Sequence, residues 1–238
     1  MPKSGADPAQ KAAVERIGHR GAPREFPENS LAAFRRAFER GADAIELDVH
    51  KTADGMVVVH HDPTLSASSK RHGGRAIAEL TLDQVRTVEL DYGIGIPTLA
   101  EVLAIVPSGA RAYVELKGSG VGDAVAGVVT AAACDCAVHS FDHAVVARMR
   151  DIAPDIPRGI LYDERSIDVG AAMRLTGARD VWPKWQLVDR PTVNRVHDAG
   201  GRVIAWTVNS RRSATSLIGF GVDGLCSDDV RLMPAPGD

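Results

Sequence analysis

Eight strand-like runs alternate with helix-like segments along the 238 residues, and no other feature constrains the fold as strongly. The strand candidates are residues 15–21, 42–50, 110–117, 136–141, 157–163, 178–183, 201–209 and 222–228. Strands that alternate with helices form parallel sheets, because each helix carries the chain back to the same edge. Eight such repeats in a chain of this length predict an α/β fold closed into a (β/α)8 TIM barrel; an open doubly wound sheet is the alternative.

The helical segments between the strands carry recognisable start and stop signals. In residues 29–41, Asn29 or Ser30 is expected to cap the helix and Gly41 to end it. In residues 189–201, Asp189 is the expected cap and Pro191 fits the first turn. These signals place a helix after a strand at the intervals that a barrel requires.

One region interrupts this rhythm after the second strand. A turn with Asp54 and Gly55 at its tip, an extended segment and a polar stretch come before the sequence IPTLAEVL, which resumes the barrel. We therefore predict a flexible tail at residues 1–14 and a barrel domain at 15–238 with an insertion at about 62–97. Because the chain leaves the barrel near the carboxyl end of a strand, the insertion is expected to lie over the active site.

Composition limits the classes of partner. The chain is 45% hydrophobic and 25% charged, with a formal charge of −3, which is typical of a globular protein and argues against a general nucleic-acid binder. No apolar run reaches membrane-spanning length, and residues 1–15 lack the apolar core of a signal peptide. We expect a cytoplasmic protein without stable membrane insertion. No feature of the sequence indicates an oligomeric state.

The three cysteines are too few for a disulfide framework. Cys134 and Cys136 stand in the sequence CDC, which matches no zinc-binding spacing, so we expect reduced thiols.

The second strand carries two carboxylates on one face. With a period of two, Glu46, Asp48 and His50 face one side, and Ile45, Leu47 and Val49 face the other. At about 7 Å, two such acids repel by about 2 kcal/mol at an effective dielectric near 20. Either an exposed edge strand or a bound cation would relieve this repulsion. The third strand brings Glu115 to the neighbouring position, which favours a hard cation, Mg²⁺ or Ca²⁺, held by all three carboxylates.

Four further polar residues fall at or just after the carboxyl ends of the first strands: His19, Arg20, His61 and Lys117. Each alone is also consistent with an ordinary strand-end residue or a surface ion pair. Together with a cation they suit a phosphodiester, since positive charges offset the phosphoryl oxygens and histidines exchange protons. We expect no role in the site for the other histidines, which are His50, His60, His72, His139, His143 and His197.

Residues 19–65 resemble the glycerophosphodiester phosphodiesterase family. The matching motifs are H-R-G, P-E-N-S, E-x-D-V, T-x-D-G and H-D-x-x-L, in that order. The resemblance continues through IPTLAEVL, VELKG, HSFDH, VIAWTVN and GVDGLCSD, over nearly the whole chain.

This resemblance implies a barrel enzyme that uses a divalent cation to release sn-glycerol 3-phosphate and an alcohol from small glycerophosphodiesters. It implies the following roles: His19 and His61 as the acid/base pair, Glu46, Asp48 and Glu115 as metal ligands, Arg20 and Lys117 as phosphate contacts, and Trp206 near the substrate.

The chain departs from the family pattern in two places. SASSKRHGG lacks the arginine that usually leads this stretch, and SDDVRL lacks the usual proline. Both lie near the expected mouth of the site, so they bear on the alcohol more than on the chemistry. The alternatives are a related enzyme that acts on lysophospholipids, a barrel enzyme with magnesium-dependent enolate chemistry, and a non-catalytic phosphate-binding protein.

Overall fold

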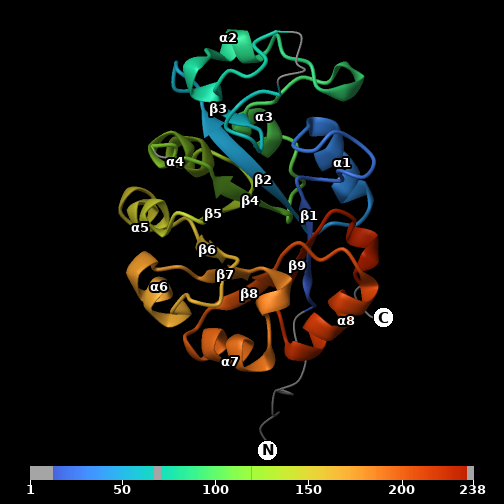
Figure 1. The fold of residues 1–238 in the computed structure, drawn as a ribbon, viewed down its shortest axis with the longest axis vertical. Coiled ribbons are helices and arrows are strands. Elements are labelled where there is room, and N and C mark those ends of the chain that lie inside the picture. Colours follow the sequence, from blue (N-terminus) through green and yellow to red (C-terminus); the bar gives the residue numbers. More distant parts are fainter. Residues whose placement is uncertain (1–12, 67–70, 119, 235–238) are drawn as a thin grey trace, which may run out of the picture.

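Eight parallel strands close into a barrel in the computed structural model, which describes residues 13–66, 71–118 and 120–234 (Figure 1). Strand β1 pairs with both β2 and β9, which closes the ring. This confirms the predicted (β/α)8 barrel and its eight strands. The strands are β1 (Glu15–His19), β2 (Ala44–Lys51), β4 (Arg111–Leu116), β5 (Asp135–Ser140), β6 (Arg158–Tyr162), β7 (Asp180–Pro183), β8 (Arg202–Ala205) and β9 (Gly224–Ser227).

Helices surround the ring of strands (Figure 1). They are α1 (Leu31–Glu39), α3 (Leu99–Leu103), α4 (Gly122–Thr130), α5 (His143–Ile152), α6 (Val169–Thr176), α7 (Arg190–Asp198) and α8 (Arg211–Phe220). Ser30 caps α1 by accepting a hydrogen bond from the backbone N–H of Ala33, while Asn29 turns its side chain to Asp48. Asp189 caps α7 as expected. The longest described helices have 10 residues, and none has the length and apolarity to cross a membrane.

Two apolar layers hold the barrel together. Outward-facing strand residues such as Leu47 and Val114 pack against α1, α3 and α4. Inward-facing residues fill the barrel itself, with Tyr113 and Trp182 as the largest side chains. Because side chains alternate along a strand, Glu46 follows the inward-facing Ala44 on the same side of β2. The apolar filling thus ends where the acidic residues begin.

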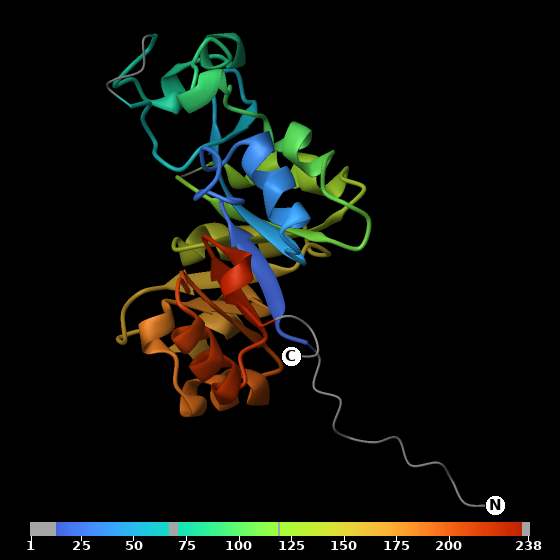
Figure 2. The same cartoon turned by 90° about the vertical axis from the view of Figure 1, so that its right-hand side faces the viewer.

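The insertion forms a small lobe beside the barrel (Figure 2). Strand β3 (Val57–Val59) pairs with β2 in the antiparallel direction, and the chain then enters the lobe. The lobe contains a 3₁₀ turn at Ile77–Glu79, helix α2 (Leu82–Val85) and a second 3₁₀ turn at Asp91–Gly93. The lobe has its own apolar core: Val58, Leu65, Ile77, Leu80, Val85, Val88 and Ile96. Residues 1–12 of the predicted tail and 67–70 of the insertion lie outside the described residues.

Charged side chains close the amino end of the barrel. Glu15 accepts hydrogen bonds from the Tyr113 hydroxyl at 2.7 Å and from Arg202 at 2.7 Å, and it lies 3.3 Å from Arg111. Arg202 also contacts Asp180, which is 1% exposed, at 3.3 Å. Arg202, on β8, therefore links β1 to β7 by contacting the carboxylates of both Glu15 and Asp180.

Replacing Arg202 with methionine should lower the free energy of unfolding by about 2 kcal/mol, because Glu15 and Asp180 would each lose a cationic partner inside the barrel. Urea unfolding measures this change. The matched control is Arg148→Met, whose guanidinium pairs with Asp123 on the surface and should contribute less than about 0.5 kcal/mol. Equal urea midpoints for the two variants would show that the ion pairs of Arg202 contribute no more to stability than a surface ion pair.

Candidate active site

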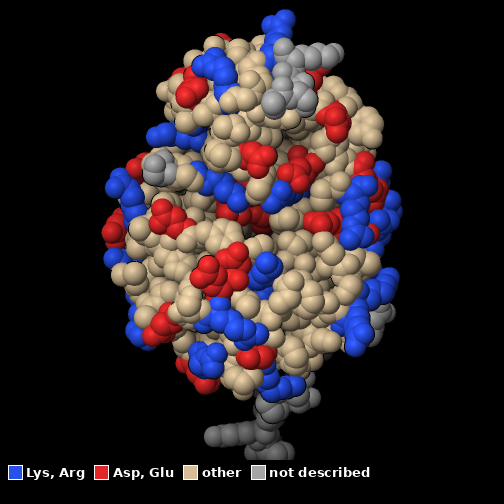
Figure 3. Space-filling view, in the orientation of Figure 1, with Lys and Arg blue, Asp and Glu red and all other residues tan. Residues whose placement is uncertain are grey.

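A cavity of about 200 Å³ opens at the carboxyl ends of the strands. It is lined by His19, Arg20, Glu46, His61, Glu115, Lys117, His139, Phe141, Leu161, Trp182, Trp206 and Cys226. Seven of the eight predicted site residues are in this lining, and Asp48 is the exception. Figure 3 shows a hollow near the centre of the barrel, with acidic and basic side chains beside each other around it.

Asp48 is buried beneath two cations. Its carboxylate lies 3.2 Å from Arg20 Nε and 3.2 Å from Lys117 Nζ, and it accepts a hydrogen bond from Asn29 Nδ2 at 2.9 Å. Burial by itself raises the pKa of Asp48, but the charges of Lys117 and Arg20 outweigh it and hold the pKa below its ordinary value. Asp48 is therefore ionised, and it holds the two predicted phosphate contacts in place.

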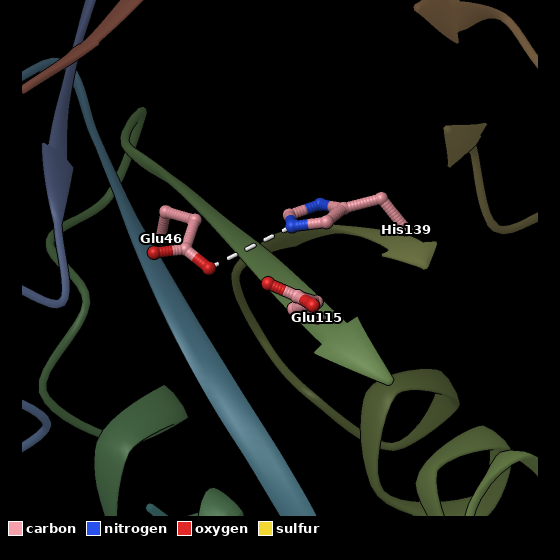
Figure 4. A group of neighbouring side chains, drawn as sticks. All are labelled: Glu46, Glu115 and His139. Atoms are coloured by element: carbon pink, nitrogen blue, oxygen red, sulfur yellow. Dashed lines mark ion pairs between the residues drawn. The ribbon is translucent and has the colours of Figure 1, made fainter. Parts of the chain in front are cut away.

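Glu46, Glu115 and His139 form a second buried group (Figure 4). They come from β2, β4 and β5, and each offers one ligand atom within 4.8 Å of the others. The parallel register places Glu115 opposite His139, whose Nε2 lies 3.6 Å from Glu46 Oε1. The His139 ring stacks on Trp182 at 4.4 Å, and its Nδ1 has no hydrogen-bond partner among the described residues.

His139, for which we expected no role in the site, lies in this group. The signal was present in residues 136–141, where a period of two puts His139 on the inward face with Ala137.

The site carries more negative than positive charge. Three buried carboxylates face two cations, Arg20 and Lys117. Burial, together with the charges of Asp48 and Glu46, raises the pKa of Glu115 to about 7 even though Lys117 Nζ lies 2.7 Å away. Two carboxylates and the imidazole Nε2 beside them are suitable donors for a divalent cation. The residues present therefore fit a metal ion, which would offset the surplus charge.

Two histidines are each held by a carboxylate. His19 Nδ1 lies 2.7 Å from Asp228 Oδ1, and His61 Nδ1 lies 2.8 Å from Asp62 Oδ1. Asn209 Nδ2 donates to the second oxygen of Asp228 at 2.5 Å. Burial lowers the pKa of His19, but the hydrogen bond to Asp228 and the charge of Glu46 outweigh it, so the pKa is raised. Both rings thus keep Nε2 for another partner.

Asp228 and Asn209 are absent from the predicted site. Asp228 stands in SDDV directly after β9, and Asn209 stands in TVN shortly after β8. Asn209 also accepts a hydrogen bond from the backbone N–H of Asp228 at 3.0 Å, which fixes the carboxylate on both sides. We assign these two residues to the positioning of His19.

One side of the mouth is aromatic. Trp206 Nε1 donates to the carbonyl of Trp182 at 2.9 Å, and its ring meets Phe141 edge to face at 5.5 Å. Phe141 is 44% exposed, so it presents an apolar surface to anything that enters the cavity. The role of Trp206 in binding substrate stays a prediction.

The insertion borders a second cleft of about 790 Å³. Its lining includes Glu28 and His60 from the barrel side and Arg71, Asp91 and Tyr92 from the insertion. Glu28 accepts a hydrogen bond from Arg20 at 2.9 Å, which connects this cleft to the active-site cations. The active-site cavity is lined by none of the described residues of the insertion, which lies beside the site, and its expected position over the site stays a prediction.

Comparison with known proteins gives a consistent result. The sequence profile of the glycerophosphoryl diester phosphodiesterase family matches residues 19–232. A glycerophosphodiester phosphodiesterase from Caldanaerobacter subterraneus subsp. tengcongensis is 28% identical over 234 residues, which cover 91% of this chain and 95% of the relative.

Solved structures agree with this match. The crystal structure of a glycerophosphodiester phosphodiesterase from Thermotoga maritima is 25% identical, with a TM-score of 0.79 over 92% of this chain and 96% of that one. A phosphodiesterase from Oleispira antarctica, solved with the product sn-glycerol-3-phosphate, shares the fold at 23% identity, with a TM-score of 0.83 over 92% of this chain and 94% of that one.

Replacing Glu115 with glutamine should stabilise the metal-free protein, because it removes the surplus buried charge. Above neutral pH we expect a gain on the order of 2 kcal/mol, or a melting temperature several degrees higher. Excess Mg²⁺ should raise the melting temperature of the unaltered protein more than that of the variant. Thermal unfolding with and without EDTA measures both effects.

The control for this comparison is Glu39→Gln, which removes a charge from an exposed residue of α1 and should leave both melting temperatures unchanged. If the Glu115→Gln variant is less stable than the unaltered protein in EDTA, the site has no destabilising excess of negative charge.

Proposed function

The chain belongs to the glycerophosphoryl diester phosphodiesterase family, and from this premise we propose that it hydrolyses small glycerophosphodiesters to sn-glycerol 3-phosphate and an alcohol. As a member of this family it is a phosphoric diester hydrolase. The observation that carries the proposal is one cavity that combines buried carboxylates, two cations and two carboxylate-held histidines.

A divalent cation, Mg²⁺ or Ca²⁺, would be held by Glu46 and Glu115 together with Asp48 or His139. When bound, it would supply positive charge to the phosphoryl oxygens. The cation, Arg20 and Lys117 would together attract the single negative charge of a phosphodiester. Arg20 and Lys117 would orient it through its oxygens.

The two histidines would move the protons. One Nε2 accepts the proton of the attacking hydroxyl, and the other donates a proton to the leaving alkoxide. Asp228 and Asp62 each hold an Nδ1–H and so keep Nε2 directed to the cavity. The same pair serves whether water or the glycerol 2-hydroxyl attacks phosphorus.

Lysophospholipids are a second candidate substrate class. The specific observation is the 44% exposed Phe141 beside Trp206, an apolar wall where a leaving group with an acyl chain would lie. We propose small water-soluble diesters as the first substrate class. We also propose that the protein is cytoplasmic.

The function is tested by supplying glycerophosphocholine, glycerophosphoethanolamine and lysophosphatidylcholine to the purified protein and identifying the products. We expect sn-glycerol 3-phosphate from the first two substrates, no turnover after exhaustive EDTA treatment, and recovery with Mg²⁺ or Ca²⁺. Undiminished hydrolysis in EDTA would contradict the need for a cation. Release of free phosphate alone would contradict the proposed phosphodiesterase activity.

The same assay shows whether Asp48 or His139 completes the metal site with Glu46 and Glu115. If His139 is a ligand, His139→Ala should raise the Mg²⁺ concentration needed for half activity by about tenfold or more. If Asp48 is the ligand, Asp48→Asn should do so instead. Circular dichroism controls for folding. An unchanged Mg²⁺ requirement in both variants would contradict both sets.

Alanine at either His19 or His61 should lower kcat by at least about 100-fold, the scale of acid–base catalysis. The double variant should lose much less than the product of the single effects, because a relay without one member is already broken. A p-nitrophenyl ester, whose leaving group needs no proton, should rescue only the variant that lacks the acid. His197→Ala, outside the cavity, is the matched control. Rescue of neither variant would refute the division into acid and base.

A further inference from the structure

The amino end of β5 carries two thiols in contact. Cys134 and Cys136 have their sulfur atoms 3.8 Å apart. Cys134 is partly exposed and Cys136 is buried, so only the first can meet a reagent from solution. Since an S–S bond is about 2.05 Å long, the sulfurs need to approach by less than about 2 Å to form one. The proposed phosphodiesterase mechanism uses neither residue.

Cys134 lines a cleft of about 960 Å³ at the outside of the barrel. The cleft runs between the end of α3 and the end of α4, and its wall consists mainly of small and apolar residues: Ala100, Leu103, Ala104, Val106, Gly127, Val128, Ala131, Ala132 and Ala133. Ser108 and Asp135 are its polar members. This lining admits a small uncharged molecule to the Cys134 sulfur more readily than an anion.

The two thiols differ in acidity. The thiol–thiolate hydrogen bond with Cys136 lowers the pKa of Cys134 to about 7 and raises the pKa of Cys136. The Asp135 carboxylate opposes ionisation of Cys134, and Arg111, 3.6 Å from that carboxylate, lies across from it. Cys134 is therefore the nucleophile at neutral pH, because only its sulfur is accessible from solution and its pKa is the lower of the two.

We propose that Cys134 and Cys136 form a redox-active dithiol whose oxidant is a small, uncharged disulfide that enters by the cleft. The Cys134 thiolate attacks one sulfur of the disulfide, which breaks that S–S bond and releases one thiolate. Cys136 then loses its proton and attacks the Cys134 sulfur of the mixed disulfide, which releases the second thiolate. The protein loses two electrons and two protons, and the small disulfide becomes two thiols.

A metal site is the less favoured use of this pair. Among the residues that the structure describes, only Glu46, Glu115 and His139 converge as a set of three or more protein ligands. Two thiolates without a third protein ligand do not make a zinc site.

The test treats the reduced full chain with bis(2-hydroxyethyl) disulfide at neutral pH and follows it by intact mass spectrometry and peptide mapping. The unaltered protein should lose two hydrogens, with Cys134 and Cys136 joined in one peptide. Cys136→Ser should instead accumulate one hydroxyethylthio adduct on Cys134. Cys134→Ser should react at least about tenfold more slowly.

Cys226→Ser is the matched control, since that buried thiol lies inside the barrel and should not affect the reaction. A lasting adduct on Cys134 in the unaltered protein, first reaction at Cys136, or disulfide-linked dimers on a non-reducing gel would each overturn the proposal. Circular dichroism of each variant separates a lost reaction from lost folding.

Discussion

The ion pairs of Asp48 with Arg20 and Lys117 are the interaction on which the rest of the candidate site depends. Arg20 follows β1 and Lys117 follows β4, so a single carboxylate on β2 holds side chains from both neighbouring strands. Asn29 fixes the same carboxylate from the turn before α1. The pairing explains how cations are kept beside a cavity that is otherwise acidic.

The barrel separates stability from chemistry along its axis. At the amino end, Arg202, Arg111 and Arg179 pair with Glu15 and Asp180, and below the site the packed rings of Tyr113 and Trp182 fill the interior. At the carboxyl end, by contrast, charges of opposite sign are not balanced, and the pKa of Glu115 is raised to about 7. Such imbalance is unfavourable for the protein without a bound cation, and a cation bound at this place would stabilise the fold.

Much of the fold could be predicted because its signals are local. The period of two in residues 42–50 and 110–117 shows which side chains face the interior, and caps such as Asp189 mark where helices begin. For the same reason the inward placement of Glu46, Asp48 and Glu115 followed from the sequence. The break in the alternation of strands and helices indicated where the insertion lies. Its apolar core could not be predicted, because its apolar residues follow no regular period.

The sequence by itself determined the barrel and most of the chemical groups in the cavity, because the alternation of side chains along each strand needs no distant contact. Only the tertiary structure decided which groups meet. His19 and Asp228 are 209 residues apart, and only closure of β9 on β1 brings them together. His139 joins Glu46 and Glu115 through the register of β2, β4 and β5. Register and closure depend on packing over the whole barrel, which no local pattern contains.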